Sequence, residues 1–121
     1  MARILVVDDE NSIRLLYAQE LAEEGHEVAT AASAVEAVEL LEKSAFDLVL
    51  LDIKLKNESG LDLLQKIVKE RHEMPVILCT AFSFYKDDFS AWLADGYVVK
   101  SSDLSELKEE IKRVMAKKKN R

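Results

Sequence analysis

Strand-like apolar runs alternate with amphipathic stretches five times along this chain, and no other feature limits its possible folds as much. The runs cover residues 4–7, 28–31, 48–51, 76–79 and 97–99. The first, third and fourth are apolar throughout, which is typical of strands that are covered by helices on both faces. Alternation of such strands with helices predicts an α/β fold with one parallel sheet and right-handed crossovers.

The stretches between these runs have apolar residues at helical spacing. This spacing predicts helices around residues 13–21, 35–41, 61–68, 82–94 and 104–114. Gly25 follows the first of them and is expected to end it. Ser33 with Glu36, and Asp103 with Glu106, have the spacing of a capping box and are expected to start two of the others.

Length and charge narrow the class of protein further. The 121 residues fit one domain over residues 1–121, and we expect residues 3–115 to form its core and residues 116–121 a basic C-terminal tail. With 17 basic and 23 acidic residues, the net charge of −6 argues against direct binding to nucleic acids or to anionic membrane surfaces. No apolar run approaches the ~20 residues of a membrane span, and nothing resembles a signal peptide, so we expect a cytoplasmic protein.

Chemically reactive side chains stand where the predicted strands end. Asp8 and Asp9 follow the first strand, Asp52 the third, Thr80 the fourth and Lys100 the fifth. In an open parallel sheet, ligands bind outside the carboxyl ends of the strands. We therefore expect these five side chains, from four separate segments, to converge at one edge of the sheet.

Three carboxylates at one edge repel each other unless a positive charge intervenes. A hard divalent cation with oxygen ligands satisfies this need, and Mg²⁺ combines a few carboxylates with water and a phosphate oxygen. Lys100 adds a fixed positive charge, and the Thr80 hydroxyl can donate to an anionic oxygen. The residues therefore predict a site for a phosphoryl group, with one carboxylate as the nucleophile.

This set of residues, together with Tyr97, resembles the receiver domain of two-component response regulators. The resemblance covers the chain from Arg3 to about Met115 and includes the runs "ILVVDDE" and "DLVLLD" and the placement of Gly60 eight residues after Asp52. It implies a single doubly wound (βα)5 flavodoxin-like domain whose five-stranded parallel sheet has the order 2-1-3-4-5. It also implies phosphoryl transfer from a phosphohistidine on a sensor histidine kinase or a histidine phosphotransfer protein.

The resemblance assigns a role to each site residue. Asp52 would be the phosphoacceptor, and Lys100 would contact a phosphoryl oxygen. Mg²⁺ (or Mn²⁺) would be bound directly by Asp9 and Asp52, largely through water by Asp8, and by the backbone carbonyl of Lys54. Such a protein is not an enzyme in the usual sense, because it assists its own phosphorylation and slow dephosphorylation.

Switching would follow from the new acceptor oxygens of an acyl phosphate. Thr80 would move to bond one of them, and Tyr97 would turn into the space that is left. The surface formed by the predicted helix 82–94, strand 97–99 and helix 104–114 would repack and could dock a downstream protein.

Three departures from the family pattern concern local structure. Ser101 follows Lys100 where many receivers have proline, Lys56 stands where many have another proline, and the stretch from Thr80 to Lys100 is about two residues short. We therefore expect the helix at 82–94 to be short and irregular. Its five aromatic residues could form a docking surface, but inward packing under the short helix is the favoured expectation: Phe82, Phe84, Tyr85, Phe89 and Trp92.

Lys54 and Phe82 lie two residues past Asp52 and Thr80, at positions that in this family flank the path of a hydrolytic water. Because an apolar Phe82 cannot orient that water, slow self-dephosphorylation is expected.

Three other interpretations stay open. A metal-dependent phosphohydrolase with an aspartyl intermediate would usually have a second acid where Lys54 stands. A flavin- or nucleotide-binding module would need a glycine-rich loop after the first strand, where Asp8, Asp9 and Glu10 stand instead. A degenerate receiver that serves only as an interaction scaffold is the third.

Overall fold

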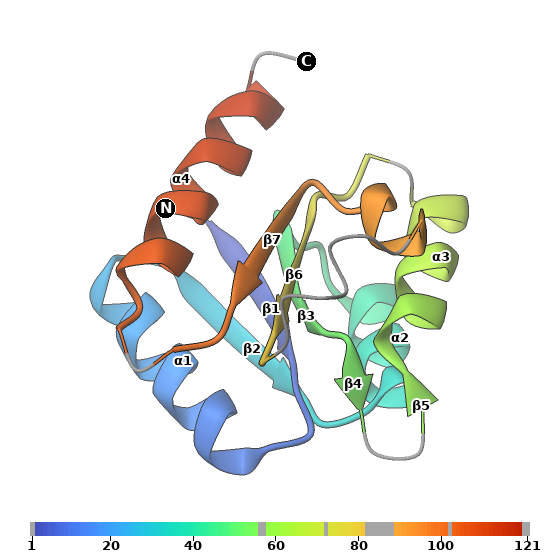
Figure 1. Ribbon diagram of the computed structural model, residues 1–121, viewed down its shortest axis with the longest axis horizontal. Coiled ribbons are helices and arrows are strands. Elements are labelled where there is room, and N and C mark those ends of the chain that lie inside the picture. Colours follow the sequence, from blue (N-terminus) through green and yellow to red (C-terminus); the bar gives the residue numbers. More distant parts are fainter. Residues whose placement is uncertain (1, 56–57, 72, 82–88, 102, 120–121) are drawn as a thin grey trace.

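A five-stranded parallel sheet forms the centre of the molecule, with helices on both faces (Figure 1). The computed structural model describes residues 2–55, 58–71, 73–81, 89–101 and 103–119. The strands are β1 (Arg3–Val7), β2 (Glu27–Ala31), β3 (Leu48–Asp52), β6 (Val76–Thr80) and β7 (Gly96–Val99). Their order in the sheet, β2-β1-β3-β6-β7, confirms the predicted order 2-1-3-4-5 and the flavodoxin-like fold.

Four α-helices and a short 3₁₀ helix are described around this sheet. They are α1 (Asn11–Glu23), α2 (Ala34–Lys43), α3 (Gly60–Glu70), η2 (Phe89–Leu93) and α4 (Ser105–Lys119). Figure 1 shows α1 and α4 on one side of the sheet and α2 and α3 on the other. Strands whose side chains all lie under helices explain why the central runs are apolar at every position.

The two faces of the sheet are built from alternate residues of each strand, as the period of two requires. Leu5 and Val7 of β1 pack in the cluster under α2 and α3, which also contains Leu41 and Leu64. Ile4 and Val6 pack in the other cluster, under α1 and α4, together with the following residues: Tyr17, Leu21, Leu107 and Ile111. The strand ends are thus held between two packed layers, and polar side chains just beyond them keep fixed positions.

Helix boundaries follow the signals in the sequence. Gly25 has φ of +92°, a left-handed conformation that residues other than glycine rarely adopt, and it lies just after the end of α1. The Ser33 hydroxyl oxygen accepts from the Glu36 amide (3.2 Å) at the start of α2. The Asp103 carboxylate accepts from the amide (2.9 Å) and the hydroxyl (2.7 Å) of Ser105 at the start of α4. These contacts satisfy amides that the first turn of a helix leaves without a partner.

The polar stretch between Asp52 and the helix predicted at 61–68 contains a small hairpin. Two short antiparallel strands, β4 (Lys54–Leu55) and β5 (Glu58–Ser59), pair with each other apart from the main sheet. Leu55 is 4% exposed and packs in the cluster under α2 and α3. The Glu58 carboxylate accepts from the Ala34 amide (2.7 Å) at the start of α2. The buried Leu55 side chain and the hydrogen bond of Glu58 therefore hold this hairpin in place, although the polar sequence gives no signal for it.

The segment between β6 and β7 differs most from the prediction. Of the helix expected over residues 82–94, the structure describes the 3₁₀ helix η2 at 89–93. Trp92 is 64% exposed, so the expectation that the aromatic residues pack inward is wrong for this residue. Ala91 of η2 is buried, and Ala94, just after η2, is half-buried against the same core cluster, so both lie on the inner side of this segment. Phe82, Phe84 and Tyr85 lie outside the described residues, and so does the side chain of Phe89.

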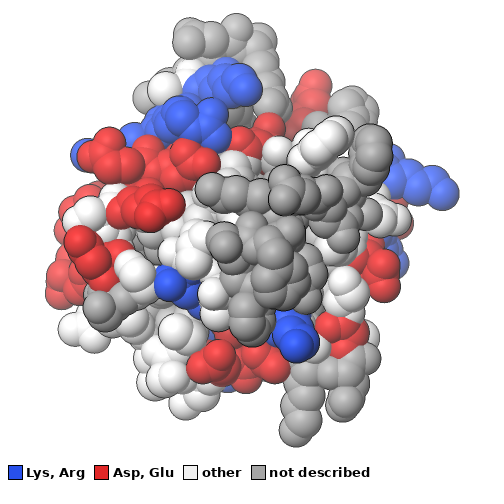
Figure 2. Space-filling view, viewed as in Figure 1, with Lys and Arg blue, Asp and Glu red and all other residues white. Residues whose placement is uncertain are grey.

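The last helix is longer than expected. Val114 is buried and Met115 is partly buried, but α4 continues to Lys119, into the predicted basic tail. In the parts of the chain that the structure describes, α4 and every other helix are too short or too polar to span a lipid bilayer. Acidic and basic side chains are interspersed over the described part of the face in Figure 2, without a broad basic area.

Candidate functional site

The ends of four parallel strands bring the predicted site residues to one edge of the sheet. Asp8 directly follows β1, Asp52 ends β3, Thr80 ends β6 and Lys100 directly follows β7. Lys100 joins two of these segments, because its ammonium Nζ lies 2.6 Å from Asp8 Oδ2 and 3.2 Å from Asp52 Oδ2. Lys100 lies 92 positions after Asp8 and 48 positions after Asp52 in the sequence, yet the three side chains form one charge cluster.

Asp8 is the most firmly held member of this cluster. It is 2% exposed, its amide donates to the Ala31 carbonyl (3.1 Å), and its Oδ1 accepts from the Glu10 amide (2.9 Å). Its Oδ2 accepts from Lys100. Both carboxylate oxygens are therefore engaged by donors from the protein.

Asp52 is 5% exposed and sits between charged and main-chain groups. Its Oδ1 accepts from the Lys54 amide (3.3 Å), and its Oδ2 faces Lys100. Burial raises the pKa of the Asp52 carboxyl to about 6; the Lys100 ammonium opposes this shift and the charge of Asp8 adds to it. Asp52 is therefore an acid at which a negative charge is costly without a cation.

Lys100 is the cation that the buried acids share. Burial lowers the pKa of its ammonium, but the hydrogen bond to Asp8 and the charge of Asp52 outweigh burial, and the pKa lies above its ordinary value. The Lys100 amide also donates to the Thr80 carbonyl (2.7 Å), which continues the contact between β6 and β7 beyond their last ladder pair. Lys100 is thus charged and fixed at both its main chain and its side chain.

Carboxylates that could hold a metal ion lie next to this ion pair. Oxygens of Asp8, Asp9 and Glu10 all lie within 4.8 Å of one another. A group of carboxylate oxygens suits a hard divalent cation such as Mg²⁺. The sequence had pointed to Asp8, Asp9 and Asp52; Glu10 was not predicted, and Asp52 is linked to this group through Lys100.

The two residues predicted to act as a switch lie on neighbouring strands. Thr80 is fully buried at the end of β6, where it pairs with Val99 in the ladder. Tyr97 is half-buried, packs against the core cluster under α2 and α3, and donates its amide to Glu110 Oε2 (3.2 Å). Tyr97 therefore connects the edge strand β7 with helix α4.

Two polar contacts near these residues were not predicted from the sequence. The Arg14 guanidinium donates to the Asp8 carbonyl (2.6 Å), and Arg113 donates to the Asp95 carbonyl (2.7 Å). Both contacts end on main-chain oxygens, which every residue carries. Apart from the position of Arg14 one turn into the helix after "DDE", the sequence holds no signal for them.

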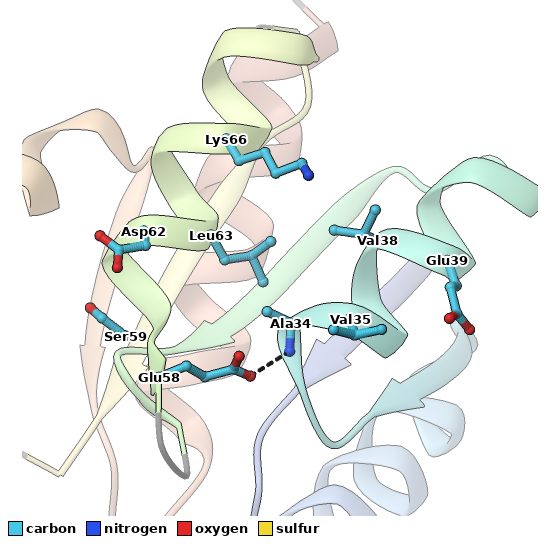
Figure 3. Close-up of a pocket in the computed structure, with 9 residues that line it drawn as sticks. All are labelled: Ala34, Val35, Val38, Glu39, Glu58, Ser59, Asp62, Leu63 and Lys66. Atoms are coloured by element: carbon cyan, nitrogen blue, oxygen red, sulfur yellow. Dashed lines mark hydrogen bonds between the residues drawn. The ribbon is translucent and has the colours of Figure 1, made fainter.

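An open groove lies elsewhere, between α2 and α3. Its volume is about 540 Å³. Figure 3 shows Leu63, Lys66 and Val38 pointing into the space between the two helices, with Asp62 and Glu39 turned away from it. The groove shares no residue with the acidic edge, so the chemistry of the strand ends is not chemistry of this groove.

Replacing Asp52 with Asn is expected to stabilise the metal-free protein at neutral pH. The folded-state pKa of about 6 exceeds the ordinary 3.8, so the folded state holds its proton more tightly than the unfolded state. That contribution to stability is complete below pH 3.8 and is lost as the pH rises through 6. Asn stays neutral throughout, and the variant should therefore gain about 2 kcal/mol over the parent at pH 7.5 and almost nothing at pH 4.

Urea unfolding in EDTA at both pH values measures this gain. Asp62→Asn is the matched control, because the exposed Asp62 should change stability by less than about 0.5 kcal/mol at either pH. A gain for Asp52→Asn that is independent of pH would contradict the raised pKa.

Comparison with known proteins gives a consistent family. Residues 4–112 match the model of the response regulator receiver domain. The chain is 39% identical over 109 residues to the alginate biosynthesis transcriptional regulatory protein AlgB of Pseudomonas putida, covering 88% of this chain and 24% of that protein. The chain thus spans about a quarter of the length of this curated relative.

Three similar solved structures share the fold and are matched over nearly their whole length. The response regulator TrrA of Thermotoga maritima, in complex with Mg²⁺-BeF, has 47% identity and a TM-score of 0.90, covering 94% of this chain and 99% of that one. The same regulator in complex with the histidine kinase ThkA gives a TM-score of 0.88 at 47% identity, over 94% and 98%. A receiver domain protein of Methanospirillum hungatei gives 0.92 at 34% identity, over 99% and 98%. With its sheet order, its strand-end residues and these matches, the chain belongs to the response regulator receiver domain family of two-component systems.

Proposed function

We propose that this protein is a signalling switch that accepts a phosphoryl group on Asp52 with the help of Mg²⁺. The observation that carries the proposal is a buried carboxylate at the end of the central strand β3, 3.2 Å from a fixed ammonium and beside a group of carboxylates. TrrA, similar over 94% of this chain, binds Mg²⁺-BeF. A nucleophile, a cation site and a positive charge in one place are the parts that phosphoryl transfer needs.

The transfer itself exchanges one bond for another. A carboxylate oxygen of Asp52 attacks the phosphorus of a phosphohistidine, the P–N bond breaks, and a P–O bond of an acyl phosphate forms. The imidazole leaves after taking a proton from solvent. Lys100 lies where it can stabilise the oxygens of the transferred group.

Mg²⁺ would be held by Asp9 and Asp52, through water by Asp8, and by the Lys54 carbonyl. Both oxygens of Asp8 already accept hydrogen bonds from the protein, which supports a contact through water rather than a direct one. When bound, the ion would neutralise the acids and polarise the phosphoryl group.

The signal would leave through Thr80 and Tyr97. An oxygen of the acyl phosphate would draw the Thr80 hydroxyl, and Tyr97 would turn into the freed space. A cavity of about 390 Å³ borders Tyr97, lined also by Trp92, Glu110 and Arg113. A downstream protein docking on η2, β7 and α4 would sense the change through these residues.

The partner that supplies the phosphoryl group is proposed to be a sensor histidine kinase or a histidine phosphotransfer protein. ThkA, a histidine kinase, binds the similar regulator TrrA. We place this activity in the cytoplasm, on the domain formed by residues 3–115, without direct contact to nucleic acid. The process that a protein containing this chain regulates would depend on the downstream partner that binds it.

Incubation with Mg²⁺ and acetyl phosphate, followed by intact-mass measurement, tests the proposal. The protein should gain one phosphoryl group, and Asp52→Ala should gain none. Omission of Mg²⁺ should also prevent the gain. No labelling of the parent protein would leave the chain as a scaffold without phosphoacceptor activity, and turnover of a phosphate ester without labelling would make it a hydrolase.

The phosphorylated protein is expected to lose its phosphoryl group slowly. Phe82, which lies outside the described residues, is apolar and cannot orient a hydrolytic water. Lys54 supplies no carboxylate at the other flanking position. After removal of acetyl phosphate, mass spectra over time should give a half-life of minutes or longer; a half-life of seconds contradicts this expectation.

A further inference from the structure

Arg14 makes a contact that the proposed chemistry does not use. It lies one turn into α1, and its Nη1 donates to the main-chain carbonyl of Asp8 (2.6 Å). Its Nη2 donates to the Asn11 side-chain oxygen (3.1 Å). Within the part of the chain that the structure describes, Arg14 forms no ion pair within 4.0 Å, although three carboxylates lie close by in the sequence.

The carbonyl that Arg14 binds belongs to the peptide group that links Asp8 to Asp9. Because that group is planar, a hydrogen bond that fixes its oxygen also fixes the positions of the Asp9 nitrogen and Cα, from which the Asp9 side chain extends. Asp8, Asp9 and Glu10 form an acidic corner between β1 and α1. A capping contact does not stabilise this corner, because Glu10 is the N-cap of α1 and its side chain makes no capping hydrogen bond. Arg14 and the Asp8 side chain therefore hold this turn between β1 and α1 together.

The choice of acceptor leaves the acids available. A guanidinium forms its strongest contacts with carboxylates, often through two parallel hydrogen bonds. Here it is spread between a main-chain carbonyl and the Asn11 amide oxygen, so it does not occupy an oxygen of Asp9 or Glu10. Arg14 thus stabilises the acidic corner through its main chain and does not compete with a cation for the carboxylate oxygens.

We propose that Arg14 is a positioning residue for divalent cation binding, because it holds the peptide group between Asp8 and Asp9, two of the proposed metal-binding residues. The inference rests on the proposed metal site, and it concerns the affinity of that site rather than the transfer step. Groups that orient metal ligands from outside the coordination sphere typically change metal affinity by 10–100-fold when they are removed.

Charge and geometry predict opposite results for the removal of Arg14. If Arg14 acted only as a positive charge near the acids, its loss would strengthen the binding of a cation. If it acts by holding the Asp8–Asp9 peptide, its loss should weaken binding. The sign of the change therefore separates the two roles.

The experiment is a calorimetric titration of the full, metal-free chain with MgCl₂. Arg14→Met keeps the length and helix propensity of the side chain and removes both hydrogen bonds. We expect its Mg²⁺ affinity to fall about tenfold. Arg14→Lys keeps the charge but not the planar fork, and its affinity should fall to a similar degree.

Arg3→Met is the matched control. Arg3 also donates to a main-chain carbonyl, that of Ala45 (3.1 Å), but it begins β1, at the strand end opposite to the acidic corner. Its replacement removes the same charge and should leave the Mg²⁺ affinity unchanged. Circular dichroism and the unfolding transition in EDTA establish that each variant is folded.

Unchanged or tighter binding in folded Arg14→Met overturns the inference. So does full affinity in Arg14→Lys, which would show that the two hydrogen bonds of the guanidinium are not needed for Mg²⁺ binding. If Arg14→Met does not fold, Asn11→Ala gives the decision, because it removes one of the two anchors of the guanidinium and should cause a smaller loss of affinity. Failure of the parent chain to bind Mg²⁺ at all would instead refute the proposed metal site and be visible before any variant is compared.

Discussion

Lys100→Met is expected to destabilise the metal-free protein by about 3 kcal/mol at pH 7.5, as is typical when one partner of a buried ion pair is removed. Lys100 is the shared partner of Asp8 and Asp52, at 2.6 Å and 3.2 Å, and all three side chains are at least 88% shielded from solvent. Met fills the space of the lysine stem but leaves two buried carboxylates without a cation. The raised pKa of Lys100 means that its charge is present at every pH below its ordinary 10.5.

The pH dependence of this loss has a defined sign. Without Lys100, the cation that holds down the pKa of Asp52 is gone, and the pKa should rise above the present value of about 6. The folded variant then takes up a proton more readily than the unfolded chain. Its deficit relative to the parent should be largest at pH 8 and should shrink as the pH falls to 5.

Two measurements separate charge from packing in this variant. Mg²⁺ should recover part of the lost stability, because a cation that binds only the folded state stabilises it and neutralises the same acids. Lys108→Met is the matched control: its ion pair with Glu20 (3.1 Å) joins α1 to α4 but is about 30% exposed, and it should cost no more than about 1 kcal/mol. Equal losses in the two variants, or a Lys100→Met deficit that neither pH nor Mg²⁺ changes, would contradict a buried charge cluster.

Lys100→Met should also be phosphorylated more slowly than its loss of stability alone explains. At saturating Mg²⁺ and a temperature at which the variant is folded, its initial rate of labelling by acetyl phosphate should fall by about 10²–10³-fold. Lys108→Met should be labelled at the parent rate. A parent-like rate for folded Lys100→Met would remove Lys100 from the proposed chemistry.

The sequence carried enough information for the sheet and for the placement of its polar ends. Runs such as 48–51, apolar at every position, require helices on both faces, and strands that alternate with helices must run parallel. Once the sheet is parallel, residues at carboxyl ends share an edge. That is why Asp8, Asp52 and Lys100 could be expected together although 92 positions separate the first from the last.

The features that could not be predicted from the sequence depend mostly on main-chain contacts and on the burial of single residues. The bond from Arg14 to the Asp8 carbonyl has an acceptor that every residue carries. The hairpin at 54–59 depends on the burial of a single residue, Leu55, within a polar stretch. The exposure of Trp92 depends on which side of this segment faces the core, and two alanines, one in η2 and one just after it, take that side.

Gly60 shows the same limit and leads to the second large effect. The sequence marks only its spacing from Asp52, whereas the structure gives its reason. A β-carbon at Gly60 would lie 1.9 Å from the Asp52 carbonyl oxygen and 2.9 Å from the Cα of Ile53. The Gly60 amide also donates to the Ile53 carbonyl (2.6 Å), so the chain after the hairpin is held tightly against the end of β3.

Gly60→Ala is therefore expected to destabilise the protein by about 3 kcal/mol, the upper end of the usual cost of overpacking, because the obstacle is main chain that cannot rotate away. Helix propensity alone predicts the opposite sign, since Gly60 is the first residue of α3 and alanine is the better helix former by about 1 kcal/mol. Any relief of the clash must move the main chain of Asp52. The labelling rate by acetyl phosphate should therefore also fall, by about 10²-fold for a displacement of about 1 Å.

Two other glycines make the comparison decisive, because each isolates one alternative cause. At Gly96 the added methyl group would meet the end of the Glu110 side chain (2.8 Å), which can swing aside, so Gly96→Ala should cost less than about 1 kcal/mol. At Gly25 there is open space but φ is +92°, so Gly25→Ala should cost about 1–2 kcal/mol through strain alone. Neither should slow phosphorylation. If Gly60→Ala ranks below Gly25→Ala in unfolding free energy, or is labelled as fast as the parent, then close contact with the phosphoacceptor strand is not the reason for glycine at this position.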